Sequence, residues 1–233
     1  MKRLISVLLL FLLGFSLWKI GQYAAESCRQ NAVFRMLASE PDLAALQEEN
    51  PDLAGWIQIP GTAIDYPVMY TPDRPDYYLY RDFSGASSDF GCIYAEESCD
   101  PAAPSDNVTL YGHTMLDGSM FAGLHSYTDW TYWETHPDIR FDSLDAQRTY
   151  RIFAVFRTSG YTGEGFAYHS FTDAASQAEF DTFVSQCKTL SLYDTGITPE
   201  YGDKIICLST CEYTQANGRL VVAAIWKKEP PDA

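Results

Sequence analysis

Two apolar runs joined by a short polar turn, near the end of the chain, constrain the fold more than any other feature. The first run, Lys204 to Ser209, leads into Cys211, and the second, Leu220 to Trp226, is preceded by Arg219. Short apolar runs bounded by polar residues indicate buried β-strands, and so short a turn makes them antiparallel neighbours. This pairing is expected to bring Arg219 alongside Cys211, at the rim of a sheet rather than in its core.

The alternation of side chains along the first of these strands predicts which residues share a face. Cys207, Ser209 and Cys211 lie on one face, and Leu208 and Thr210 lie on the other. An isolated cysteine is usually a buried, inert thiol, but a neighbouring cation changes that expectation. Arg219 beside Cys211 favours the thiolate and can stabilise an oxyanion that develops during a reaction.

A histidine occupies a similar place far upstream. The apolar strand predicted at 108–112 ends in Gly112, which allows close approach, and His113 follows it. A thiol, an imidazole and a guanidinium at the ends of rigid strands can build a nucleophilic acyl-transfer site. The remaining histidines, His125, His136 and His169, lack a comparable setting. A zinc site formed by Cys207, Cys211 and His113 has no supporting ligand spacing, so no metal or cofactor is expected.

Short strands separated by long loops predict a mainly β fold, a closed barrel of eight strands with few helices. The expected strands are 56–59, 64–69, 91–94, 108–112, 139–141, 149–157, 204–209 and 220–226. Before them we expect helices at 22–37 and 43–49, the second capped by Asp42. Another helix precedes the cysteine strand, with Phe180, Phe183, Val184 and Cys187 on one face and either Ser176 or Thr172 as its N-cap.

The first residues are almost wholly apolar behind Lys2 and Arg3. With Lys19 snorkelling, the stretch from Leu4 to Gly21 would give about 27 Å of helix, close to the thickness of a bilayer core. We therefore expect a signal anchor at 1–21 with its N-terminus in the cytoplasm, a helical stalk at 22–49, a catalytic barrel at 50–228 and a tail at 229–233. A cleaved signal peptide is the alternative, although Tyr23-Ala24-Ala25 is a poor cleavage site.

Charge and cysteine content narrow the possible partners. The net charge is -15, and Lys2, Arg3 and Lys19 belong to the N-terminal segment, so the barrel is more acidic still. Such a surface repels nucleic acid and anionic lipid headgroups. The spacing of the six cysteines is not that of a disulfide scaffold, although Cys92 and Cys99 are close enough in sequence to pair.

Taken in order along the chain, these motifs resemble the class B sortases, membrane-anchored cysteine transpeptidases of Gram-positive bacteria. The resemblance covers about residues 50–228. Its segments are 50–57, 64–68, 111–113 with 117–121, 191–196, and 208–211 with Arg219. Two departures stand out. Thr114 replaces the asparagine common after the histidine, and Tyr213 stands where some relatives carry an acidic residue, which leaves Glu212 as the local carboxylate.

The resemblance implies an eight-stranded sortase barrel in which Cys211, His113 and Arg219 are catalytic. It also implies that residues of the helix-bearing loop line a substrate groove, together with Leu79, Ser209, Thr210 and Glu212. The implied reaction cleaves an Asn/Ser-Pro-x-Thr type sorting motif after Thr, through a thioester on Cys211. The surface protein is then transferred to an amine of a peptidoglycan precursor, outside a cell membrane that the chain crosses once.

Two other functions are weighed against this one. A cysteine peptidase that only hydrolyses its substrate would use similar chemistry, but in papain-like enzymes the cysteine precedes the histidine, whereas here Cys211 follows His113. A non-catalytic membrane-anchored binding module would leave Cys211, His113 and Arg219 together by coincidence.

Overall fold

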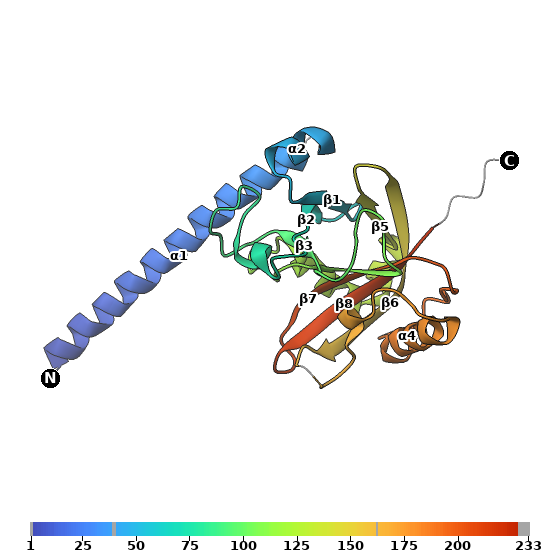
Figure 1. Cartoon of the computed structure of the whole chain (residues 1–233). Helices are drawn as coiled ribbons and strands as arrows, with labels where there is room; N and C mark the ends of the chain where they lie inside the picture. The colour runs from blue at the N-terminus through green and yellow to red at the C-terminus, as the bar shows by residue number, and fades with distance from the viewer. Residues whose placement is uncertain (1, 39–40, 162, 228–233) are drawn as a thin grey trace.

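The barrel is the central element of the computed structural model, which describes residues 2–38, 41–161 and 163–227. Within these residues, eight strands close into a barrel in the order β1-β2-β3-β4-β7-β8-β6-β5 (Figure 1). They are β1 (Leu53–Gln58), β2 (Asp65–Met69), β3 (Ile93–Ala95), β4 (Asn107–Tyr111), β5 (Asp138–Asp142), β6 (Gln147–Ser159), β7 (Ile205–Glu212) and β8 (Gly218–Trp226). The predicted eight-stranded barrel is confirmed, and the expected tail at 229–233 lies outside the described residues.

Two of the pairings between neighbouring strands are parallel. These are β2 with β3 and β4 with β7, and the other neighbours around the barrel are antiparallel. Strand β7 continues to Glu212, past the end expected at Ser209. Its last residues are polar, but they remain paired with β8 because sheet pairing uses backbone groups. The turn between β7 and β8 is therefore shorter than the sequence predicted.

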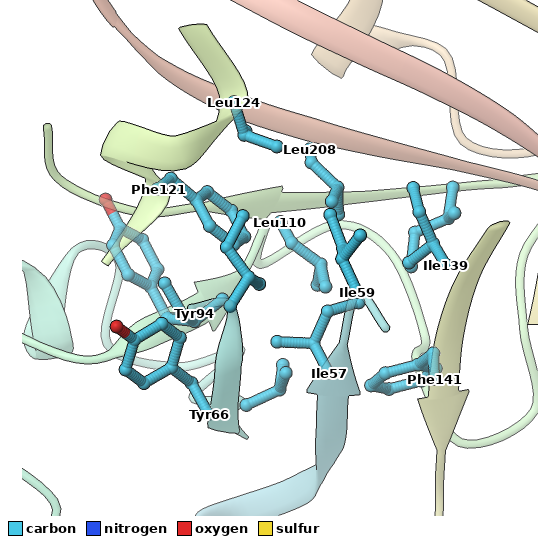
Figure 2. Packing of buried hydrophobic residues seen from close by; sticks show 14 of the residues in the cluster. Ile57, Ile59, Tyr66, Tyr94, Leu110, Phe121, Leu124, Ile139, Phe141 and Leu208 are labelled. Carbon is cyan, nitrogen blue, oxygen red and sulfur yellow. The ribbon is translucent and has the colours of Figure 1, made fainter. Parts of the chain in front are cut away.

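The barrel interior is filled by apolar side chains from most of the strands (Figure 2). Leu110 on β4 and Leu208 on β7 are both fully buried there. Cys207, on the opposite face of β7, belongs to a second apolar cluster outside the barrel. The predicted alternation along β7 is therefore confirmed for Cys207 and Leu208.

The outer cluster is covered by α4 (Gln177–Leu190), which packs against β6. Its buried residues are the predicted Phe180, Phe183, Val184 and Cys187. Ser176 is the N-cap, and its hydroxyl accepts a hydrogen bond from the Glu179 N–H at 3.3 Å. The Glu179 carboxylate accepts from the Ala175 N–H at 2.9 Å, one residue earlier than in a reciprocal capping box.

The N-terminal segment forms one continuous helix, α1 (Lys2–Ala38), which includes both the expected anchor and the helix expected at 22–37. Among the described residues it is the helix long and apolar enough to cross a membrane, over Ile5–Ala38, and an 18-residue window within it has a mean hydropathy of 1.7. Its N-terminal half projects away from the barrel (Figure 1). Its second half is part of the folded domain, because Phe34 is buried with its ring edge-on to Tyr66 at 5.2 Å.

Shorter helices occupy the connections. Helix α2 (Leu43–Glu49) is present as predicted, with Asp42 accepting hydrogen bonds from the backbone N–H groups of Ala44 and Ala45. The four others were not predicted, because they are short and lack a clear apolar period. They are the 3-10 helices η1 (Tyr77–Tyr80), η2 (Phe121–Thr128) and η3 (Tyr168–Ser170), and α3 (Trp130–Thr135).

Truncation of Phe34 tests whether α1 belongs to the barrel core. Phe34→Ala should lower the free energy of unfolding by about 3 to 5 kcal/mol, the cost of removing a buried aromatic ring. Denaturant unfolding of the detergent-solubilised chain would measure it. Arg35→Ala, an exposed neighbour on the same helix, is the control and should change stability little. Equal unfolding midpoints for Phe34→Ala and the unmodified protein would mean that α1 contacts the barrel without contributing to its stability.

Candidate active site

The site lies where two parallel strands end side by side. In the ladder of β4 and β7, Tyr111 is paired with Ser209, and the next amide, Gly112 N–H, donates to the Ser209 carbonyl at 3.1 Å. Continuing this register by two residues places His113 next to Cys211. The strand ends therefore bring together two residues that are almost a hundred positions apart in sequence.

Antiparallel pairing supplies the third residue. Cys211 on β7 is the direct partner of Arg219 on β8, as the sequence predicted from the short turn. On its other side, Arg219 is paired with Thr158 of β6. The Arg219 side chain lies close to Gly160, because a Cβ at that glycine would be 3.1 Å from the guanidinium carbon.

Cys211 differs from the other cysteines in exposure. All six are free thiols; Cys211 is partly exposed, Cys28 of α1 is exposed, and the other four are buried. Burial raises the pKa of Cys92, Cys187 and Cys207, and it raises the pKa of Cys99 to about 12. These four thiols are therefore protonated and poorly nucleophilic at neutral pH, as expected for small buried apolar residues.

The guanidinium of Arg219 is tied to the β7–β8 turn by one of its nitrogens. Nη1 donates to Asn217 Oδ1 at 3.1 Å and to the Gly218 carbonyl at 3.0 Å. Within the described residues these are the hydrogen bonds of the Arg219 side chain, so Nε and Nη2 remain for a ligand. A guanidinium held in this way presents donors in a fixed plane.

The imidazole of His113 is oriented by a main-chain carbonyl. Nε2 of His113 lies 2.7 Å from the Leu79 carbonyl oxygen, and the ring packs against Tyr80 with centroids 5.4 Å apart. Because a carbonyl only accepts, Nε2 carries a proton, and Nδ1 is the basic nitrogen of the neutral ring. Leu79, predicted to border a substrate groove, thus contacts His113 through its backbone.

Three other residues predicted to bind substrate have buried side chains. Ser209 and Thr210 are almost fully buried, the first bonded to the Tyr168 hydroxyl at 2.6 Å and the second to the Gly112 carbonyl at 2.7 Å. Both oxygens of the Glu212 carboxylate accept hydrogen bonds from Thr214, at 2.9 Å to its N–H and 2.8 Å to its hydroxyl. The carboxylate is thereby engaged in shaping the turn.

Sequence reasoning missed several residues that surround these side chains. Tyr168 holds Ser209, and Tyr80 covers His113. His125, dismissed for its setting, reaches the Cys211 carbonyl with Nε2 at 3.1 Å. Their positions depend on loops that fold back from distant parts of the chain. Only Tyr80 could have been found from the sequence, because it directly follows Leu79, which was predicted to border the substrate groove.

A groove of about 1080 Å³ lies on the outer side of the barrel between α4 and the segment that follows β6. Phe166, Phe171 and Phe183 supply apolar walls, and Thr214 and Gln215 of the β7–β8 turn border it. The helix-bearing loop thus forms a groove that reaches the same turn that positions Arg219.

Comparisons with known proteins agree with this architecture. The sortase domain model matches residues 57–226. Sortase B of Listeria monocytogenes is 31% identical over 225 residues, covering 89% of each chain. The structure of a Staphylococcus aureus sortase B–substrate complex superposes with a TM-score of 0.76 at 27% identity, over 91% of this chain and 99% of that one. A Bacillus anthracis sortase B structure gives 0.70 at 36% identity, over 79% and 83%.

The fold and these similarities define the protein as a cysteine transpeptidase of the sortase type. The chain belongs to the sortase family, and its resemblance to class B, first seen in the motifs, is confirmed by relatives named sortase B.

A substitution behind the Leu79 carbonyl tests whether it orients His113. A Cβ at Gly91, where φ is +61°, would lie 2.4 Å from the Leu79 oxygen and displace it. Gly91→Ala should lower kcat by about 10²-fold, the cost of a misplacement near 1 Å. The matched control is Gly85→Ala, in the same loop with φ +80° and only the Tyr77 hydroxyl nearby at 3.7 Å. If both variants lose activity equally, backbone strain rather than the carbonyl is responsible.

Proposed function

We propose that this enzyme cleaves an Asn/Ser-Pro-x-Thr type sorting motif after Thr and joins the released carboxyl end of a surface protein to an amine of a peptidoglycan precursor. The observation that carries the proposal is the placement of Cys211, directly opposite Arg219 and beside the strand end that bears His113. A family of cysteine transpeptidases that includes this chain supports the same chemistry.

Acylation is the first half of the proposed reaction. The Cys211 thiolate attacks the carbonyl carbon of the motif threonine, and the free donors of Arg219 stabilise the developing oxyanion. The C–N bond then breaks, and His113, whose Nδ1 has taken the proton of the Cys211 thiol, gives that proton to the departing amine. The product is a thioester between Cys211 and the threonine carboxyl group.

Transfer reverses these steps with a different amine. The incoming amine attacks the thioester carbon, His113 accepts its proton, and the thiolate of Cys211 leaves. Water in place of the amine would give hydrolysis, the outcome expected of a plain cysteine peptidase. Membership of a transpeptidase family favours transfer to an amine, and it favours an enzyme over the non-catalytic binding module.

We further propose that α1 crosses the cell membrane once and holds the barrel outside, against its surface. Lys2 and Arg3 before the apolar run favour a cytoplasmic N-terminus. Ser27, which bonds Asp117 of the barrel, lies six residues beyond Gly21, or about 9 Å along the helix. Since α1 is continuous there, the site would have a set height above the membrane, where exported proteins and membrane-bound precursors meet.

The acyl-enzyme can be detected directly. Incubation of the detergent-solubilised protein with an Asn-Pro-x-Thr peptide and an acid quench should yield one thioester adduct, on Cys211, by mass spectrometry. Adding a glycine peptide should discharge it into an amide product. Cys211→Ala should reduce turnover to background, whereas Cys28→Ser, at the other accessible thiol, should leave it unchanged. Cleavage at another bond, or products that never contain the amine, would contradict the proposal.

Exchange of the guanidinium for an ammonium tests the role of Arg219. Arg219→Lys keeps the charge but loses the planar donors, so kcat/KM should fall by about 10²-fold, as for the loss of an oxyanion donor. Arg140→Lys on the exposed side of β5 makes the same exchange away from the site and should have little effect. An Arg219→Lys enzyme with the original rate would show that positive charge alone is sufficient.

A further inference from the structure

Beyond the last backbone pair of β4 and β7, a cluster of side chains continues the connection between the strands. Thr210 Oγ1 lies 2.7 Å from the Gly112 carbonyl and 2.7 Å from Thr114 Oγ1. The Cys211 carbonyl is 3.0 Å from Thr114 Oγ1 and 3.1 Å from His125 Nε2. The residues before and after His113 are thereby joined to Cys211 and to its neighbour Thr210.

Counting protons gives these hydrogen bonds a direction. The Thr210 hydroxyl has one proton, which it donates to the Gly112 carbonyl. The contact between the two threonines is then donated by Thr114, whose single proton takes the shortest of its three polar contacts; the third is His125 Nε2, 3.3 Å from Thr114 Oγ1. The donor that remains for the Cys211 carbonyl is Nε2–H of His125.

His125 comes from a part of the fold that is well anchored. It belongs to η2, in which Phe121, Leu124 and Tyr127 are fully buried in the barrel core. Because η2 is anchored in this way, the His125 ring has little freedom to move relative to the barrel. The Cys211 main chain is therefore bonded to a rigid element and not only to its strand neighbours.

We propose that His125 is a positioning residue that fixes the end of β7 for catalysis. Its Nε2–H holds the carbonyl of Cys211, and Thr114 and Thr210 extend the connection to Gly112, the residue before His113. The cluster thereby keeps Sγ and the imidazole in one relative position where the regular ladder has ended. This role rests on the proposed function of Cys211 and His113 as a reacting pair.

Three substitutions separate the hydrogen bond from the space that the ring fills. The amide nitrogen of glutamine reaches the position of Nε2, whereas that of asparagine reaches only the position of Nδ1. His125→Ala and His125→Asn should lower kcat by about 10- to 100-fold with KM changed by less than about twofold. His125→Gln should recover activity to within about threefold of the unmodified enzyme.

Amide hydrogen exchange of the β7 end provides a readout that does not depend on activity. The Thr210–Glu212 amides should exchange faster in His125→Ala and as in the unmodified protein in His125→Gln. His136→Ala removes a ring that stacks on Tyr132 at 4.3 Å, and as the control it should alter neither exchange there nor kcat.

Several results would overturn the proposal. They are an original kcat in His125→Ala, a glutamine variant as impaired as alanine, and unchanged exchange at the β7 end in every variant. If the unmodified protein fails to turn over the motif peptide, the proposed function is wrong, and hydrogen exchange alone then decides whether His125 holds the strand end.

Discussion

The parallel pairing of β4 with β7 is the interaction on which the site depends. It joins segments about a hundred residues apart, so closing the intervening chain has an entropic cost that grows slowly with its length. Burial offsets that cost, because the paired Leu110 and Leu208 both lie in the barrel interior with no exposed surface. Every candidate catalytic side chain is attached to this ladder or to β8 beside it.

Strand register then determines which thiol becomes accessible. Successive residues of β7 point to opposite faces, and Leu208 and Cys207 belong to different apolar clusters. A shift of one residue would place Cys207 inside the barrel and exchange Cys211 with Thr210. Because Leu208 fills the interior, the core that stabilises the barrel also selects the face on which Cys211 lies.

The elements that could be predicted from the sequence are those with a local cause. Apolar runs indicated the strands, a 3.6-residue period indicated α4, and the short turn placed Arg219 opposite Cys211. The Leu79 carbonyl at His113 and the His125 ring at Cys211 could not be predicted, because loops from distant parts of the chain bring them there. The expected anchor and the helix expected at 22–37 run together as α1, since a lone Gly21 weakens a helix without ending it.

The resemblance places Ser209 and Thr210 beside the nucleophile, but it does not say where their side chains lie. Residues adjacent to a nucleophile were expected to line a groove, yet their hydroxyls are bonded inside the protein. A buried hydroxyl without a partner would be costly, and each of these has found one. Their hydroxyls bond the Tyr168 hydroxyl and the Gly112 carbonyl, and the place of these two residues at a substrate groove stays a prediction.

Helix α1 contacts both loops that flank His113. Ser27 and Asn31 bond Asp117, four residues after the histidine, while Glu26 accepts from the Asp89 N–H at 3.0 Å, in the loop after Leu79. Partial burial opposes ionisation of Asp117, but hydrogen bonds from Ser119 and Ser27 lower its pKa, so the acceptor stays charged at neutral pH. The same helix that would lie in the membrane thus contacts, through its C-terminal half, the loops that position His113, the candidate acid and base. A tilt of α1 relative to the barrel would have to break these hydrogen bonds. Because they hold both loops that flank His113, such a tilt would change the position of the imidazole.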